Sequence, residues 1–192
     1  RQPGSAFKPF VYLAALDQKI KPTDIILDAP LSYDQGVGLP KWKPANYTKK
    51  FYGPSPVRLG IEKSRNLMTA RLALLVDMEN IKKYGKSFGI YDNLPKLLSM
   101  SLGAGETTLM RLTTAYAMIV NGGKKIKPIM IDRVQDRRGK TIFRSDLRKC
   151  ENCKLDNYND LTNIPKLLDE RKQVTDPGSA YQMVSMLRGA VT

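Results

Sequence analysis

The chain has 192 residues, of which 42% are hydrophobic and 26% charged, proportions typical of a single globular domain with a sizeable core. Its net charge of +14 would attract polyanions, but the basic residues are scattered along the chain, so we interpret them mostly as solvated surface and expect no nucleic-acid partner. The absence of histidine excludes Ser-His-Asp and Cys-His catalysis and His-ligated metal sites, and no apolar run reaches the length of about 18 residues that a membrane-spanning helix needs.

The first stretch, "SAFKPFVYLAALDQ", predicts a helix that starts near Ser5, because its apolar residues recur at helical spacing. Pro9 is compatible with this helix because it lies close to the first turn. Residues 21–56 are rich in Pro, Gly, Tyr and Asp and predict short strands and loops. This connection is longer than most loops, which favours a role in forming one wall of a functional site.

Two further helices are predicted in "PVRLGIEK" and "NLMTARLALLVDME". Ser64 and Arg65 separate them, so Ser64 and Asn66 are expected at a helix junction, where side chains can point into a cleft. The stretch "NIKKYGKSFGI" predicts a short helix that ends at Gly89.

A longer helix is predicted in "GAGETTLMRLTTAYAMIVNGG", and the apolar residues of one face are expected to be core: Leu109, Leu112, Tyr116 and Ile119. The stretch "KPIMIDRVQDRRGKTIFRSD" predicts two strands around a turn at Arg138 and Gly139. Residues 147–171 are polar and irregular, and we interpret them as an insertion. The last helix is expected to begin with Asp176 as N-cap and Pro177 at its first position.

Cys150 and Cys153 form a lone C-x-x-C pattern without the second pair that a structural zinc site needs. A local disulfide and two unpaired thiols are the interpretations that we favour. A metal shared with another chain and a redox role are the alternatives.

The pair Ser5 and Lys8 can carry nucleophilic chemistry without histidine. Residues three apart on a helix are neighbours, so a neutral Lys8 amine could accept the proton of the Ser5 hydroxyl. This requires desolvation or a nearby cation to lower the lysine pKa, and backbone N–H donors facing the developing oxyanion. An S-x-x-K match alone is expected about once by chance in a chain of this length. The "SRN" at Ser64 to Asn66 could likewise be helix capping.

The ordered combination of motifs is far more specific than any one of them. The chain resembles the transpeptidase domain of penicillin-binding proteins, specifically the bifunctional class A enzymes, for whose superfamily S-x-x-K, S-D-N and K-T-G are characteristic. The resemblance covers nearly the whole chain apart from residues 147–171. It is carried by "RQPGSAFKPFVYLAALD", "LPKWKPANYTKKFYGPSPVRLGIEKSRN", "MSLGAGETTLMRLTTAYAMIVNGG" and "SAYQMVSMLRGAVT".

The resemblance implies a mainly α fold with minor β structure. We expect residues 1–192 to form a partial transpeptidase domain, the helical lobe and flanking loops of the penicillin-binding-protein and β-lactamase-like α/β fold, with most of the central sheet missing. No K-T-G or K-S-G occurs in the chain. That motif would supply a cation beside Lys8 and part of the oxyanion hole, so the isolated chain is expected to acylate poorly or not at all.

The resemblance also implies roles for four residues. Ser5 would be the acylated nucleophile and Lys8 its base, while Ser64 and Asn66 would shuttle a proton and donate to the substrate peptide. The expected partners are D-Ala-D-Ala stem peptides of peptidoglycan and the β-lactams that mimic them, and no cofactor or metal is implied. A module that binds β-lactam without turnover, as a sensor, is the alternative.

For the parent protein, the resemblance implies an anchor in the bacterial inner membrane and an upstream glycosyltransferase domain, with this domain facing the periplasm. Contact with the membrane would be made only by parts of the parent outside this chain. An oxidising exterior would favour a disulfide between Cys150 and Cys153.

Overall fold

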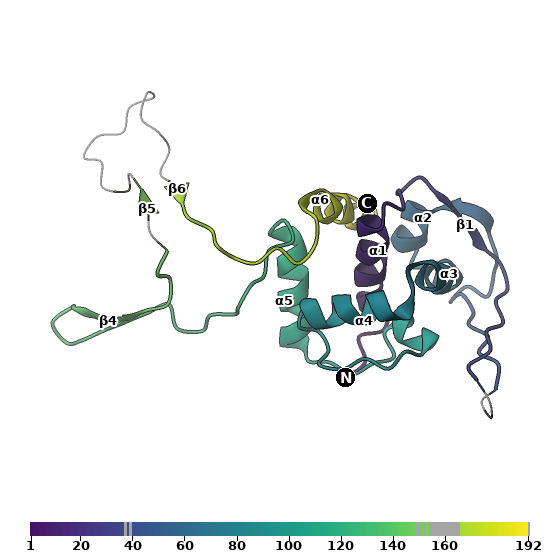
Figure 1. Ribbon diagram of the computed structural model, residues 1–192, viewed down its shortest axis with the longest axis horizontal. Helices are drawn as coiled ribbons and strands as arrows, with labels where there is room; N and C mark the ends of the chain where they lie inside the picture. Colours follow the sequence, from purple (N-terminus) through teal and green to yellow (C-terminus); the bar gives the residue numbers. More distant parts are fainter. Residues whose placement is uncertain (37, 39, 149, 152, 154–165, 192) are drawn as a thin grey trace, which may run out of the picture. The chain divides into compact units, whose positions relative to one another are not determined.

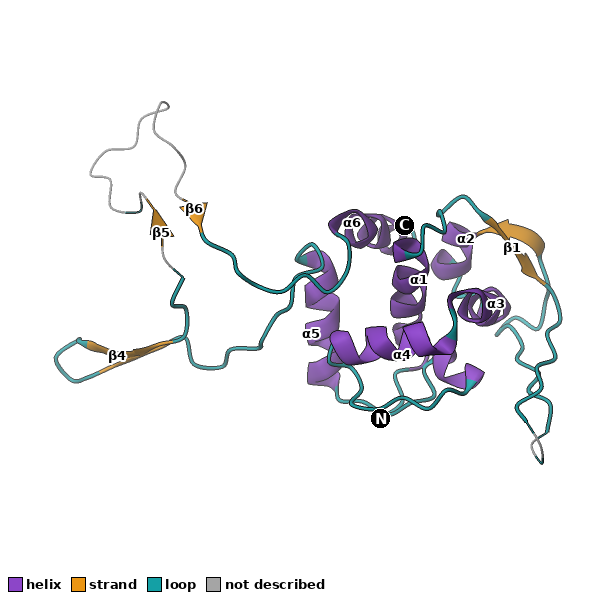
Figure 2. Ribbon diagram, viewed as in Figure 1, coloured by secondary structure: helices purple, strands orange, loops and turns teal. Residues whose placement is uncertain are grey.

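The structure, a computed structural model, describes residues 1–36, 38, 40–148, 150, 151, 153 and 166–191. The chain forms two compact units, which are described separately: Arg1–Ile126 with Gln173–Thr192, and Lys127–Lys172. Helices dominate the first unit, and the described strands pair only as two-stranded antiparallel sheets (Figure 2). The expectation of a mainly α chain with minor β structure is confirmed. Among the described residues, no helix has both the length and the apolarity required to cross a membrane.

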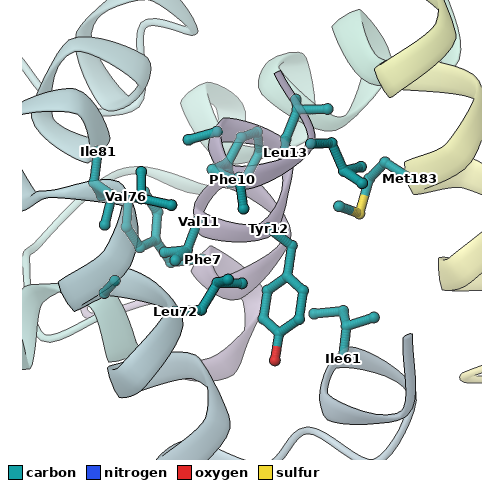
Figure 3. Packing of buried hydrophobic residues seen from close by; sticks show 14 of the residues in the cluster. Phe7, Phe10, Val11, Tyr12, Leu13, Ile61, Leu72, Val76, Ile81 and Met183 are labelled. Atoms are coloured by element: carbon teal, nitrogen blue, oxygen red, sulfur yellow. The ribbon is translucent and has the colours of Figure 1, made fainter. Parts of the chain in front are cut away.

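The first unit is built around one buried helix, α1 (Lys8–Asp17). Every residue from Lys8 to Leu16 is buried, because α3 (Asn66–Val76), α4 (Met78–Ser87) and α6 (Pro177–Arg188) all pack against α1 (Figure 1). Figure 3 shows its side chains pointing outward into the surrounding helices. A helix that is apolar on all sides is expected to lie in a core.

The predicted helix start near Ser5 needs a correction. Ser5 lies in a 3₁₀ turn, η1 (Gly4–Phe7), and the α-helix itself begins at Lys8 with Pro9 in its first turn. In the first turn Pro9 needs no intrahelical partner for its missing N–H, whereas in an α-helix that began at Ser5 its ring would meet the Ser5 carbonyl four residues earlier.

The predicted helix junction is confirmed, whereas the next boundary differs from the prediction. The helices α2 (Val57–Glu62) and α3 flank Ser64 and Arg65. The predicted continuous helix through residue 79 is wrong, because Asp77 adopts φ 72° and its side chain accepts a hydrogen bond from the N–H of Glu79. Asp77 thereby ends α3 and caps α4.

The helix α5 (Leu109–Val120) follows a 3₁₀ turn, η2 (Leu98–Leu102). Ile119 is buried, and Leu112 and Tyr116 pack against the core as expected. Leu109 is 82% exposed, so its assignment to the core is wrong. Residues 108–111 are all exposed, which means that the first turn of α5 has no covering layer. The helix α6 begins as predicted, with the Asp176 carboxylate accepting from the N–H of Ser179.

Residues 21–56 form strands and loops, as predicted. The strands β1 (Ile25–Asp28) and β2 (Gly53–Pro56) pair antiparallel, with Asp28 opposite Gly53. Along β1, exposed and buried residues alternate, so Ile26 and Asp28 face inward. Within the segment that connects the two strands, Tyr33 and Trp42 form an isolated antiparallel β-bridge.

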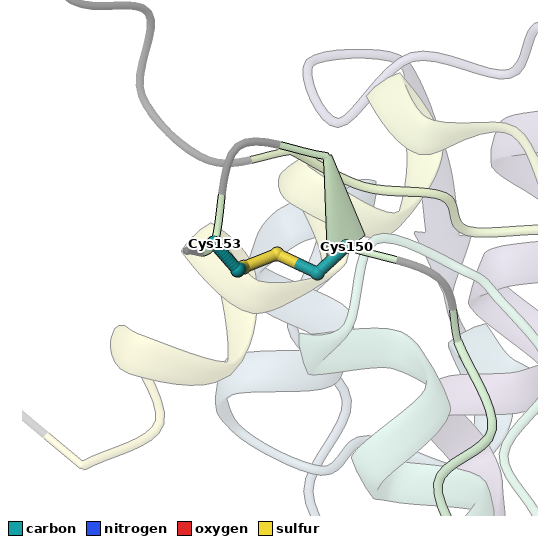
Figure 4. Close-up of a disulfide and its surroundings, with 2 residues drawn as sticks. All are labelled: Cys150 and Cys153. Carbon is teal, nitrogen blue, oxygen red and sulfur yellow. A yellow bond between two sulfur atoms is a disulfide. The ribbon is translucent and has the colours of Figure 1, made fainter. Parts of the chain in front are cut away.

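The second unit contains two small antiparallel pairs. The strands β3 (Arg133–Gln135) and β4 (Thr141–Arg144) flank the predicted turn, and β5 (Cys150–Glu151) pairs with β6 (Lys166–Leu167). Cys150 and Cys153 are joined as a disulfide (Figure 4), the first of the interpretations weighed for them. Of the predicted insertion at 147–171, residues 149, 152 and 154–165 lie outside the described residues, and the assignment stays a prediction.

Candidate active site

The segment that carries Ser5 rests on a close contact between two glycine backbones. Gly4 adopts φ 57° and donates its N–H to the carbonyl of Gly103 at 3.1 Å. Gly103 itself has φ 79°, and a Cβ atom there would collide with the backbone of Gly4. The Tyr116 hydroxyl donates to the carbonyl of Ala6 at 2.8 Å. These contacts fix the turn so that the Ser5 side chain is exposed.

Lys8 is buried, with only 1% of its surface exposed. Its amine donates to three acceptors: the backbone carbonyl of Ser64 at 2.6 Å, the Ser64 hydroxyl at 3.0 Å and Oδ1 of Asn66 at 2.6 Å. Three acceptors match the three protons of an ammonium group. Burial lowers the pKa of Lys8 to about 8, which meets the desolvation condition required of a lysine base.

Ser64 holds the turn between α2 and α3 in a left-handed conformation, with φ 50°. A non-glycine residue in this region is strained, and such strain concentrates at functional sites. The turn is closed by the N–H of Ser64 donating to the carbonyl of Ile61 and by the N–H of Arg65 donating to that of Gly60. The resulting geometry presents both the carbonyl and the hydroxyl of Ser64 to Lys8.

The capping interpretation of "SRN" is not supported by the observed bonds. The N-cap of α3 is Arg65, which makes no side-chain capping hydrogen bond. The Asn66 amide instead donates from Nδ2 to the carbonyl of Ala45 at 2.7 Å and accepts from Lys8 at Oδ1. Asn66 therefore links the lysine to the loop that carries Trp42, Pro44 and Asn46.

The structure thus brings three of the four predicted residues into direct contact: Lys8, Ser64 and Asn66. Ser5 lies one turn before Lys8, and the Lys8 N–H donates to the Ser5 carbonyl. Within the described part of the chain, the Ser5 hydroxyl makes no hydrogen bond, to the Lys8 amine or to any other group.

A cavity of about 370 Å³ adjoins the Ser64 turn. Its lining includes Tyr47, Tyr52, Lys63 and Arg65, and the Arg65 guanidinium stacks over the Tyr52 ring at 4.1 Å from the ring centroid. Sequence reasoning did not identify Arg65 as part of this site. Stacking on an aromatic face is a contact that arginine favours.

Asp28 is a second residue that sequence reasoning missed. Its side chain is fully buried, and both of its carboxylate oxygens accept from Nδ2 of Asn46. One feature of the sequence could have pointed to it: in the strand "IILD", Asp28 occupies an inward-facing position, where an apolar residue is expected.

Comparison with known proteins gives a consistent result. The chain matches the family model described as "Penicillin binding protein transpeptidase domain" over residues 1–192. It is 49% identical over 195 residues to penicillin-binding protein 1A of Rickettsia bellii, covering 100% of this chain and 24% of that protein. Penicillin-binding protein 1A of Pseudomonas aeruginosa is 36% identical over 147 residues, covering 76% of this chain and 18% of that protein.

Solved structures share the fold. The crystal structure of penicillin-binding protein 1A from Haemophilus influenzae matches 100% of this chain and 30% of that chain with a TM-score of 0.84 at 24% identity. Penicillin-binding protein A of M. tuberculosis, solved as an imipenem acyl-enzyme complex, matches 99% of this chain and 43% of that chain with a TM-score of 0.75 at 17% identity. The chain spans about a quarter of the length of the first relatives. It belongs to the penicillin-binding protein transpeptidase domain family.

Proposed function

We propose that this chain carries the nucleophile of a peptidoglycan D,D-transpeptidase. In the full-length parent protein, D-Ala-D-Ala stem peptides would acylate Ser5. The observation that supports this most strongly is the buried amine of Lys8, bound to Ser64 and Asn66 and one turn away from the exposed Ser5. A lysine of lowered pKa beside a serine is the arrangement that activates a hydroxyl in the absence of histidine.

In the proposed acylation, Oγ of Ser5 attacks the carbonyl carbon of the D-Ala-D-Ala amide while neutral Lys8 takes the hydroxyl proton. The ammonium that forms is held by its three acceptors. The C–N bond then breaks, and the departing amine of D-Ala receives a proton that reaches it from Lys8 through the Ser64 hydroxyl. The product is an ester between the stem peptide and Ser5.

In the second step, an amine of a neighbouring stem peptide attacks the ester carbonyl and loses a proton, and Ser5 regains its own. This forms the cross-link and frees the serine. A β-lactam enters the same first step, but its cleaved amide remains tethered to the acyl group, so no leaving group departs. M. tuberculosis penicillin-binding protein A has been solved as such acyl-enzyme complexes, with imipenem and with penicillin G.

The parent protein is proposed to be a bifunctional cell-wall synthase with a glycosyltransferase domain and an anchor in the bacterial inner membrane, the present domain facing the periplasm. The support is the length of the relatives, of which this chain covers about a quarter. The disulfide between Cys150 and Cys153 is compatible with an oxidising compartment.

Intact-mass spectrometry after incubation with benzylpenicillin tests the proposed nucleophile. The full-length protein should gain one penicilloyl group, and Ser5→Ala should gain none. Ser87→Ala is the matched control, because Ser87 is also an exposed serine of the first unit but lies at the end of α4. Acylation that persists in Ser5→Ala would contradict the proposal.

The same measurement on the isolated chain tests the role of the absent third motif. Removing one oxyanion donor typically costs about 10²–10³ in rate, so acylation of this chain alone should be slower than that of the full-length protein by at least that factor.

Release of the acyl group by an amine acceptor separates a transpeptidase from a sensor, since a sensor would keep its acyl group.

A further inference from the structure

A buried carboxylate is paired with the residue that follows Ser64, and the hydrogen bonds and ion pair described for it go to Asn46 and Arg65 and not to the proposed catalytic residues. Asp28 ends β1 and its side chain is fully buried. Nδ2 of Asn46 donates to its two oxygens at 2.8 and 3.1 Å, and Nε of Arg65 lies 3.7 Å from Oδ2. A buried ionised group is costly unless it is paired and hydrogen-bonded. Here the hydrogen bonds come from Asn46, and Arg65 adds an ion pair at 3.7 Å without a hydrogen bond from its Nε.

The Asp28 carboxylate and the Lys50 carbonyl together determine how the Asn46 side chain is oriented. Because a carboxylate can only accept, the NH₂ end of the Asn46 amide must face Asp28, where it also donates to the carbonyl of Lys50 at 2.9 Å. The oxygen end is thereby left for the N–H of Leu67, 3.3 Å away in the first turn of α3. Asp28 thus fixes the loop around Asn46 against the start of α3.

The orientation of the Asn66 amide is set in the same way, by the backbone carbonyl of Ala45. The Ala45 carbonyl accepts from Nδ2 of Asn66 at 2.7 Å, and a carbonyl cannot donate. The oxygen of the Asn66 amide must therefore point the other way, toward the Lys8 amine at 2.6 Å. A shift of Ala45 would remove the constraint that keeps an acceptor in front of the lysine.

Arg65 provides a second connection from the same carboxylate. It stands between Ser64 and Asn66 in the chain, and its Nη1 donates to the Ser55 hydroxyl at 2.8 Å while its guanidinium stacks on Tyr52. With its Nε near Asp28, the side chain is held on several sides and is 11% exposed. The backbone of the strained Ser64 turn is thereby anchored from beneath.

We propose that Asp28 is a positioning residue for Lys8: acting through Asn46 and Arg65, it holds the Asn66 amide oxygen and the Ser64 carbonyl against the lysine amine. This inference rests on the proposed function in that Lys8 is taken as the base. It assigns a role to Asp28, which lies outside the sequence motifs that carry the resemblance.

The test is an NMR titration of the Lys8 side chain in this chain, following the ¹³Cε shift against pH. Asp28→Asn keeps the size of the side chain but removes the group that can only accept. Losing an acceptor disfavours the ammonium form, so the pKa of Lys8 should fall by roughly half a unit or more. Asp24→Asn, the removal of an exposed carboxylate just before β1, is the matched control and should leave that pKa unchanged.

A double-mutant cycle separates positioning from direct charge. In an Asn66→Ala background, Asp28→Asn should lower the pKa of Lys8 by clearly less than in the wild type, because the route through the Asn66 amide is gone and only the route through Arg65 remains. An equal fall in both backgrounds would mean that Asp28 does not act through the Asn66 amide and would overturn the proposal. No fall in the wild-type background would overturn it as well.

If circular dichroism finds Asp28→Asn unfolded, Asn46→Ser decides the question, since it keeps the pair of Asp28 and Arg65 and removes only the amide. It should lower the pKa of Lys8 in the same direction, and an unchanged pKa would refute the proposal. The titration requires no acylation. Its failure is therefore distinguishable from a failure of Ser5 to form the penicilloyl ester.

Discussion

The Lys8 amine lies 2.6 Å from the amide oxygen of Asn66, although 58 positions separate the two residues in the chain. This contact joins the start of the central helix to the start of α3. It gives a buried cation a polar partner whose orientation is fixed by a third segment, through the carbonyl of Ala45.

Acylation should depend on pH through Lys8. The neutral amine is the base, so the rate constant for acylation of the full-length protein by benzylpenicillin should rise with pH and level off above the pKa of Lys8, which burial holds below its usual value. Lys8→Met should lose about 10²–10⁴ in rate, because proton transfer by a positioned side chain contributes about that much. Stopped-flow acylation at pH values on both sides of the lowered pKa of Lys8 measures both. A rate that does not vary with pH would contradict the role of Lys8 as base.

Stability should also respond to the titration of Lys8. Burial lowers its pKa to about 8 from 10.5, so between these values the unfolded chain holds a proton that the folded chain has released. Unfolding then takes up protons, and the free energy of unfolding increases as pH rises through this window. The total contribution is on the order of 3 kcal/mol, at about 1.4 kcal/mol per pKa unit.

Urea unfolding of the wild type and Lys8→Met at several pH values measures this term. The difference between the two proteins isolates Lys8, because the buried tyrosines titrate alike in both. The free energy of unfolding of the wild type should rise relative to that of Lys8→Met as pH increases from about 8 toward 10.5. A difference between the two proteins that is constant across this range would mean that Lys8 is not desolvated.

Gly103 is expected to tolerate no side chain. A Cβ atom there would collide with the backbone of Gly4, whereas Gly122, which also has positive φ, has nothing within 4 Å of such an atom. Both alanine variants carry the cost of a left-handed residue, and only Gly103→Ala adds overpacking. Gly103→Ala should therefore lower the free energy of unfolding by roughly 1–3 kcal/mol more than Gly122→Ala.

Urea unfolding of both glycine variants checks this difference. The displacement of Gly4 should also slow acylation of Ser5 in the full-length protein, an effect that Gly122→Ala should lack. Equal stabilities and equal acylation rates in the two variants would show that the contact between Gly4 and Gly103 does not position the nucleophile.

The disulfide should be local in its effects. A thiol count with 5,5'-dithiobis-nitrobenzoate on the unreduced, denatured chain should find no free thiol, since Cys150 and Cys153 are bonded to each other. A ring between residues three apart constrains the unfolded chain little, so reduction should leave the unfolding of the first unit unchanged. Two free thiols in the unreduced protein would exclude the disulfide.

Much of the helical arrangement could be predicted from the sequence, because periodic apolar residues and capping residues act over a few positions. The junction at Ser64 and the start of α6 at Pro177 are examples. The break at Asp77 is also local, because its side chain caps the next helix, and the sequence prediction missed this signal. The exposure of Leu109 could not be predicted in this way, since it depends on which neighbouring element covers the first turn of α5.

The sequence by itself determined that Ser5 and Lys8 lie one turn apart and that Ser64 and Asn66 share a helix junction, since local spacing sets both. Only the tertiary structure decided that the junction meets the lysine, that burial lowers the lysine pKa, and that Asp28 lies beneath the turn. Desolvation and long-range hydrogen bonds depend on which segments pack together. No pattern within one stretch of the chain contains that information.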